Sequence, residues 1–147
     1  MLCAGRRLPS TGWRYAGRLM ATLPVFEQLT SHTFFHRLEE RSSDGDRSAL
    51  ICFTSPSCGS CRAFKRVLPA VRELASSRGS DAADLDVFEV DAGESMGLTN
   101  EHDVVDLPAL FLYRGAEYHA SLQAPPDPSA LLCAVLAALE RPPEEAP

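Results

Sequence analysis

Segments with strand-like and helix-like patterns of apolar residues alternate along most of the chain. Ser48–Thr54 is a continuous apolar run, which is typical of a strand buried on both faces, and Leu85–Val90 alternates in the manner of a strand. Between residues 59 and 77, apolar side chains recur at helical spacing and predict a core-facing stripe. The predicted strands are Pro24–Leu29, Ser48–Thr54, Leu85–Val90, Ala109–Tyr113 and Glu117–Ser121, and the predicted helices cover residues 31–41, 59–77, 94–102 and 128–139. This order, β-α-β-α-β-α-β-β-α, indicates one α/β domain over about residues 22–140.

Individual residues mark the boundaries of these elements. We expect Ser31 to cap the first helix, and Asp127 followed by Pro128 to begin the last one. Pro69 lies inside the second helix and is expected to kink it without ending it, because the apolar stripe continues beyond it. A hairpin is predicted where Arg114-Gly115-Ala116 separates the last two strands. Residues 141–147 are expected to form a disordered tail.

Composition and charge exclude several classes of function. The chain has 147 residues, of which 45% are hydrophobic and 23% charged, as in an ordinary globular domain. No apolar run approaches the roughly 20 residues that a transmembrane helix needs, so we expect no membrane span. A net charge of -6 argues against a nucleic-acid partner, whose binding needs clustered positive charge.

The first residues differ in charge from the rest. Residues 1–21 contain Arg6, Arg7, Arg14 and Arg18 and no acidic residue, a pattern that resembles an organellar transit peptide. The alternatives are a plain extension and a translation start at Met20. The sequence therefore favours a cytoplasmic protein, or a mitochondrial-matrix protein if this basic leader is a transit peptide.

The pair Cys58-Gly59-Ser60-Cys61 lies where a buried strand passes into a helix. Free N–H groups and the positive end of the helix dipole stabilise an anion there, which favours the thiolate of Cys58. Cys61 follows one turn later and is within disulfide reach. An accessible thiolate backed by a second thiol is the minimum for exchange with a substrate disulfide. A zinc or iron–sulfur site needs a second ligand pair, so we expect no metal.

Taken with its surroundings, this motif resembles the thioredoxin family. The resemblance covers most of residues 22–140 and includes the Cys58–Cys61 motif, the two strands on either side of its helix, and the stretch His102–Ala109. It implies a central mixed β-sheet flanked by helices on both faces. It also implies that Leu107-Pro108 is a cis-proline loop facing the cysteines, whose backbone binds an incoming substrate chain. No bound cofactor is implied.

Several positions depart from the family pattern. Cys52 occupies the position of a buried Asp that assists deprotonation of the second cysteine. We hypothesise that Glu89 on the next strand replaces it as general base, because burial makes a carboxylate more basic; the alternative is a solvated strand residue. Ser57 replaces an exposed Trp and Ser60 replaces a Pro, so the surface offered to partners should differ from that of other members.

The resemblance implies a thiol–disulfide oxidoreductase. Cys58 would be the nucleophile and Cys61 the resolving thiol, with Ser57, Leu107 and Pro108 as substrate contacts. The expected partners are protein disulfides and an unidentified reductase, and a monomer is expected. The competing interpretations are a non-catalytic adaptor of the same fold and a dedicated oxidase or isomerase. Of the five cysteines, Cys52 and Cys133 are expected to be buried and unpaired, the alternative for Cys52 being a third redox thiol linked to Cys61.

Overall fold

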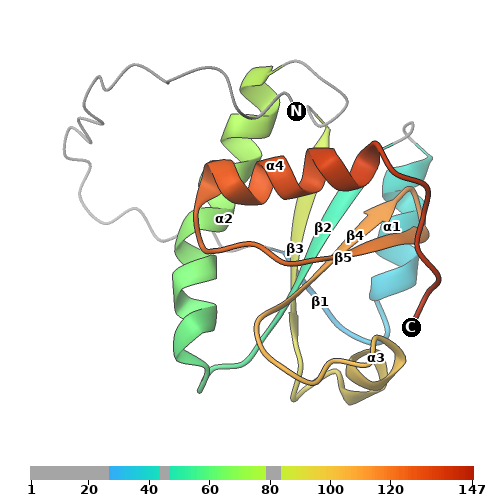
Figure 1. Cartoon of the computed structure of the whole chain (residues 1–147). Coiled ribbons are helices and arrows are strands. Elements are labelled where there is room, and N and C mark those ends of the chain that lie inside the picture. The colour runs from blue at the N-terminus through green and yellow to red at the C-terminus, as the bar shows by residue number, and fades with distance from the viewer. Residues whose placement is uncertain (1–26, 44–46, 79–83) are drawn as a thin grey trace.

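A five-stranded mixed sheet organises the chain (Figure 1), in a computed structural model that describes residues 27–43, 47–78 and 84–147. The strand order is β1-β3-β2-β4-β5; β1, β3 and β2 run parallel, while β4 is antiparallel to β2 and β5 to β4. The strands are β1 (Glu27–Leu29), β2 (Ser48–Thr54), β3 (Leu85–Asp91), β4 (Ala109–Arg114) and β5 (Glu117–Leu122). The expected mixed sheet is confirmed. The leader over residues 1–21 and the start of the first predicted strand lie outside the described residues.

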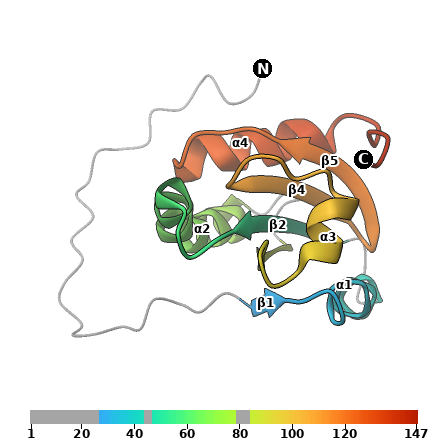
Figure 2. The same cartoon turned by 90° about the horizontal axis from the view of Figure 1, so that it is seen from below.

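Helices cover both faces of this sheet. They are α1 (Phe34–Ser42), α2 (Gly59–Arg78), α3 (Met96–Glu101) and α4 (Pro128–Leu139). Side chains of α2 and α4 pack with one face of the sheet in one apolar cluster, and those of α1 and α3 pack with the other face in a second cluster. Figure 2 shows α4 and α1 on opposite sides of the sheet. Among the described residues, no helix combines the length and the apolar character needed to cross a membrane.

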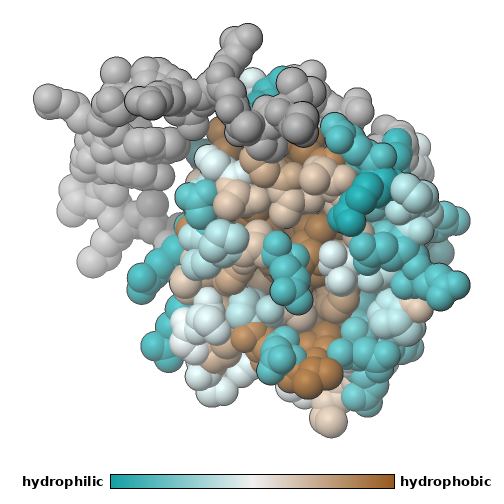
Figure 3. All heavy atoms as spheres, viewed as in Figure 1, coloured by the Kyte–Doolittle hydropathy of each residue, from teal (hydrophilic) through white to brown (hydrophobic). Residues whose placement is uncertain are grey.

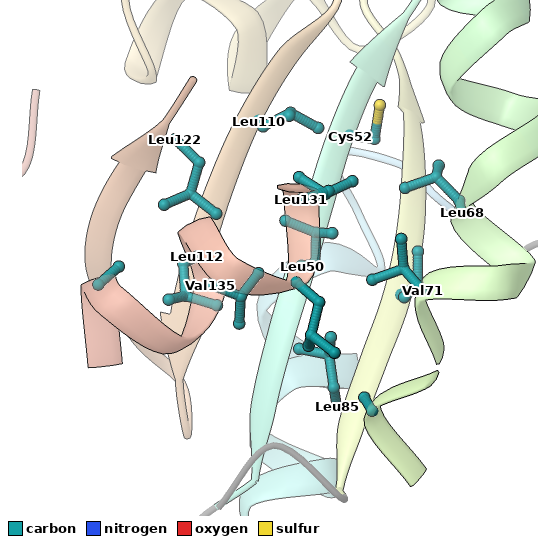
Figure 4. Close-up of a cluster of buried hydrophobic side chains, with 14 of the residues drawn as sticks. Leu50, Cys52, Leu68, Val71, Leu85, Leu110, Leu112, Leu122, Leu131 and Val135 are labelled. Atoms are coloured by element: carbon teal, nitrogen blue, oxygen red, sulfur yellow. The ribbon is translucent and has the colours of Figure 1, made fainter. Parts of the chain in front are cut away.

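The centre of the sheet is the most buried part of the molecule. All seven residues of β2 are buried, as its continuous apolar run predicts. Leu50 and Cys52 project from β2 to the side where Leu68 and Val71 of α2 and Leu131 of α4 lie (Figure 4). On the outer surface, Figure 3 shows apolar side chains gathered over the middle of the face that α4 covers, bordered by polar ones.

The strand β3 is buried on both faces although its sequence alternates. It lies between β1 and β2 and under helices on both sides, so Asp86 and Glu89 are buried along with its apolar residues. Each carboxylate is compensated by a cation: Arg47 Nε lies 3.2 Å from Asp86, and Lys65 forms an ion pair with Glu89. Buried charges of this kind persist only when they are paired.

Most element boundaries agree with the expected ones. Asp127 caps α4 by accepting a hydrogen bond from the Ala130 N–H at 2.8 Å, with Pro128 in the first turn as predicted. The helix α2 continues past Pro69 to Arg78. The Ser31 cap is wrong: α1 begins at Phe34, and its N-cap residue Thr33 forms no side-chain cap hydrogen bond.

The hairpin and the chain end complete the fold. Gly115 has a φ of 62°, a left-handed conformation that glycine adopts without strain, and it turns β4 into β5 as predicted. The sequence predicts a disordered tail over residues 141–147. In the structure the Glu144 N–H donates to the His119 carbonyl at 2.8 Å, and the Glu144 carboxylate accepts from the Ser121 N–H at 3.1 Å. These two bonds hold the tail against β5.

Candidate active site

Two cysteines lie together where β2 ends and α2 begins. The Cys58 and Cys61 sulfurs are at disulfide-bonding distance and their Cα atoms are 5.3 Å apart. Cys58 is half-buried, whereas Cys61, in the first turn of α2, is fully buried. The Cys61 N–H donates to the Cys58 sulfur at 3.2 Å. Because the first N–H groups of a helix have no partner within the helix, this donor is free to stabilise negative charge on Cys58.

The loop that contains Leu107 and Pro108 is distant in sequence but lies beside Cys58. The Cys58 sulfur lies 3.7 Å from the carbonyl oxygen of Leu107, and the Leu107–Pro108 peptide bond is cis. Leu107 and Pro108 are both half-buried, so this loop is partly exposed to solvent. The structure therefore brings together the two motifs that the sequence places almost 50 residues apart.

His102 anchors the start of this loop. Its Nδ1 lies 2.7 Å from the Leu98 carbonyl oxygen, which can only accept, so Nδ1 carries the proton. Its Nε2 lies 2.7 Å from the Tyr113 hydroxyl and accepts from it. The ring is buried between aromatic neighbours, including Phe53 and Phe111, and this burial lowers the pKa of His102. The two bonds tie the end of α3 to β4, the two elements between which the loop runs.

The two serines of the motif region have different surroundings. Ser57, a predicted substrate contact, is exposed, and its hydroxyl lies 2.9 Å from that of Ser55. The Ser60 hydroxyl lies 3.4 Å from the Cys58 sulfur and also 3.4 Å from the Leu107 carbonyl oxygen. Sequence reasoning treated Ser60 only as a missing proline and did not identify this contact. The available signal was a hydroxyl two residues after Cys58.

Glu89 projects from β3 towards α2, on the same side of the sheet as the cysteine pair. It is buried, and its Oε1 accepts a hydrogen bond of 2.5 Å from the Thr54 hydroxyl and pairs with Lys65. Lys65 lies four residues after Cys61, one helical turn along α2. Glu89 is therefore not a solvated strand residue, and its proposed role as a base remains a prediction. Lys65 is a neighbour that the sequence analysis did not identify.

Two further cysteines lie in the described part of the chain, and they differ: Cys52 is a free thiol and Cys133 is not. Cys52 pairs with Glu89 in the β2–β3 register and is fully buried and free. Burial, and then the nearby Glu89 charge, raise the pKa of Cys52 to about 12, against a smaller lowering by Lys65. The expectation for Cys133 is wrong, because this residue is half-buried and is not a free thiol.

A groove begins at the same loop. It has a volume of about 950 Å³ and is lined by Pro108 and Asp106, by Phe64 of α2 and by the chain end at Glu144. A substrate chain bound at Cys58 would have room to extend past Pro108 along this surface. Across the described ranges, no three His, Cys, Asp or Glu side chains come together as ligands for a metal ion.

The fold and the close Cys58–Cys61 pair are compatible with thiol–disulfide redox activity. Comparison with known proteins identifies the family. The family model described as Thioredoxin matches residues 25–137. The chain therefore belongs to the thioredoxin family. A comparison with curated proteins finds no match.

Solved structures share the fold at low sequence identity. The chain is similar to human ERp44 in its zinc-bound form, with a TM-score of 0.64 and 12% identity over 76% of this chain and 30% of that one. It is similar to a structure that describes thiol resolution in yeast mitochondrial 1-Cys peroxiredoxin via glutathione/thioredoxin systems. The TM-score is 0.61 and the identity 16%, over 78% of this chain and 97% of that one. It is also similar to the first two thioredoxin domains of Naumovozyma dairenensis Eps1p, with a TM-score of 0.59 and 17% identity over 74% of this chain and 39% of that one. The chain thus corresponds to less than half of two of these structures.

Proposed function

We propose that this protein is a thiol–disulfide oxidoreductase that exchanges disulfides with protein substrates through Cys58 and Cys61. The observation that carries the proposal is the difference in burial between the two cysteines. Cys58 is half-buried beside the Leu107 carbonyl, whereas Cys61 is enclosed behind it. One sulfur is reachable by a partner, and the other is reachable only from Cys58.

The reaction follows from that arrangement. The Cys58 thiolate attacks one sulfur of a substrate disulfide, so a mixed disulfide forms and the first substrate thiolate leaves. Cys61 then loses its proton and attacks the Cys58 sulfur, and the second substrate thiolate leaves. The substrate gains two electrons, and the protein is left with the Cys58–Cys61 disulfide, which a separate reductase or dithiol protein must reduce.

The neighbouring residues have defined roles in this proposal. The Cys61 N–H, 3.2 Å from the Cys58 sulfur, stabilises its thiolate. The backbone of Leu107 and the ring of Pro108 hold the substrate chain, with the exposed Ser57 at its edge. Glu89 accepts the proton of Cys61 in the second step, since it is a buried carboxylate on the side of the sheet that faces α2.

Reduction of insulin disulfides by dithiothreitol tests the proposal. The wild-type protein should accelerate the reaction, and Cys58→Ser should not, because the nucleophile is removed. Equal rates for the two proteins would contradict the proposal and favour a non-catalytic adaptor. A redox titration of the Cys58–Cys61 pair then separates a reductase from an oxidase or isomerase, since about 30 mV corresponds to a tenfold change in the equilibrium.

A further inference from the structure

The groove beside the cis-proline loop is lined by acidic side chains from two separate segments. Four of its lining residues are acidic and exposed: Asp103 and Asp106 of the loop, and Glu144 and Glu145 of the tail. Of the described residues that line the groove, only His102 is basic. Its ring is buried, and this burial lowers the pKa of His102, so it adds no positive charge at neutral pH. The groove is therefore negatively charged and has no cation of its own.

The tail side of the groove is part of the folded structure. Glu144 is bonded to β5 through both its N–H and its carboxylate. Glu145 follows directly and also lines the groove. Across the described ranges, no basic side chain forms an ion pair with Asp106 or Glu145. A partner thus meets acidic groups that are already in place and unpaired, which lowers the entropic cost of binding.

The loop also exposes an apolar side chain in this groove. Val105 precedes Asp106, lines the same groove and is 89% exposed. It lies two residues before Leu107, whose carbonyl oxygen is 3.7 Å from the Cys58 sulfur. Lysine and arginine side chains pack their aliphatic stems on apolar surface and keep the charged head in a polar environment. An exposed valine next to an unpaired carboxylate offers both parts of that contact.

We propose that this groove selects protein substrates in which a lysine or arginine lies a few residues from the reacting cysteine. The inference rests on the proposed function and names the substrate class of the same site. Val105 contacts the aliphatic stem, and Asp106 and Glu145 attract the charged head, so these three are specificity-determining residues. The chemistry at Cys58 is unchanged, because the groove acts on the association and orientation of the substrate.

Peptide disulfides of different charge test the inference. Each peptide carries one cysteine joined to a chromophoric aryl thiol, with arginine, alanine or glutamate placed in turn at each neighbouring position. The Cys58 thiolate of the reduced protein attacks the peptide sulfur, and the coloured aryl thiolate leaves. At low ionic strength the best arginine peptide should react about fivefold faster than its alanine counterpart, as expected for an exposed ion pair. At about 1 M salt this preference should disappear, because charges are screened beyond about 3 Å.

Three variants locate the preference in the groove. Asp106→Asn and Glu145→Gln keep the side-chain size and should each reduce the preference for arginine, whereas Asp106→Lys should make the glutamate peptide the faster one. Glu73→Gln is the matched control: it changes the net charge equally at an exposed position of α2 outside the groove, and should keep the wild-type preference. A preference that is unchanged in Asp106→Asn and Glu145→Gln, or reduced as much in Glu73→Gln, would overturn the inference.

A binding measurement separates this inference from the proposed function. Equal rates for the three peptides in the wild type, or a faster glutamate or alanine peptide, would overturn the inference and leave the oxidoreductase intact. If no peptide reacts, the proposed function fails, and fluorescence anisotropy with labelled peptides whose cysteine is replaced by serine then decides. Tighter, salt-sensitive binding of the arginine peptide, lost in Asp106→Asn, would support the selective groove. Equal binding of the arginine and glutamate peptides would overturn it.

Discussion

The hydroxyl of Ser60 lies 3.4 Å from the sulfur of Cys58. The same hydroxyl is also 3.4 Å from the Leu107 carbonyl oxygen, so it can donate to either acceptor by rotating. When Cys58 is a thiolate, the charged sulfur is the stronger acceptor, because hydrogen bonds to ionised groups exceed neutral ones. The residue between the two cysteines is therefore in a position to favour the reactive form of the first.

Removing this hydroxyl should make Cys58 less reactive at neutral pH. A hydrogen bond to a charged group contributes about 1.5–3 kcal/mol, and Ser60 is exposed, so the lower end of this range applies. In Ser60→Ala, we expect the midpoint of the alkylation rate against pH to rise by roughly one unit, which corresponds to 1.36 kcal/mol. The rate of iodoacetamide alkylation of the reduced protein, measured over a pH series, gives this midpoint.

Ser55→Ala is the matched control for this prediction. Ser55 lies in the same loop, and its hydroxyl contacts Ser57 but has no contact with the Cys58 sulfur. This variant should keep the wild-type midpoint. A midpoint that is the same in Ser60→Ala and in the wild type would show that the N–H groups at the start of α2 stabilise the thiolate alone.

Cys52 should behave as an inert core residue. Its pKa of about 12 leaves almost no thiolate at pH 8, and the side chain is fully enclosed. We expect iodoacetamide to label Cys58 in the folded, reduced protein and to label Cys52 only after unfolding in urea, as read by peptide mass mapping. Labelling of Cys52 in the folded protein at a rate near that of Cys58, or a trapped Cys52–Cys61 disulfide, would refute this assignment.

Local sequence signals predicted most of the fold. The apolar run of β2, the stripe of α2 and the Asp127–Pro128 start of α4 are each decided by neighbours in sequence, and all three were correctly predicted. The Ser31 cap failed because residues 31–33 form a turn before α1, in which Thr33 accepts a hydrogen bond from the Thr30 N–H at 3.0 Å. Propensity alone does not fix the first residue of a helix to within one or two positions.

The sequence predicted the two cysteines and, through the family resemblance, the Leu107–Pro108 loop that faces them, but it did not predict the contacts of Lys65 and Ser60. Spacing and a strand–helix junction locate Cys58 and Cys61, since both are local features. The pairing of Lys65 with Glu89 joins α2 to β3 across the sheet face and depends on the parallel register of β2 and β3. Nothing in the spacing of residues 65 and 89 encodes that register. The contact between Ser60 and Leu107 depends in the same way on where the distant loop lies.

The cap of α4 provides a test of local stability. Asp127 accepts the Ala130 N–H at 2.8 Å, one of the helix N–H groups that would otherwise lack a partner. Asp127→Ala should lower the free energy of unfolding by about 1 kcal/mol. Asp127→Asn, which keeps an acceptor oxygen, should lose much less. Urea unfolding of the wild type and the two variants measures their free energies of unfolding. Equal values would mean that the Asp127–Ala130 hydrogen bond does not stabilise the protein.

The buried His102 should make stability depend on pH. Burial lowers the pKa of His102 below its usual 6.5, because the charged ring would lose its hydration. The Tyr113 hydroxyl, whose own pKa burial raises to about 12, stays protonated and donates to Nε2. Above pH 6.5 the ring is neutral in both the folded and the unfolded chain. Below pH 6.5 the unfolded chain binds a proton that the folded protein does not, so the folded state loses stability as the pH falls.

Urea unfolding at pH 7.5 and pH 5.5 measures this loss. His102→Gln retains a donor for the Leu98 carbonyl and an acceptor for the Tyr113 hydroxyl but cannot take up a proton. The wild-type protein should therefore lose more of its unfolding free energy between the two pH values than the variant does. Because the two proteins differ at this position alone, the difference between their losses isolates the contribution of His102. Equal losses would show that the ring is protonated as readily in the folded protein as in the unfolded chain, despite its enclosure between Phe53 and Phe111.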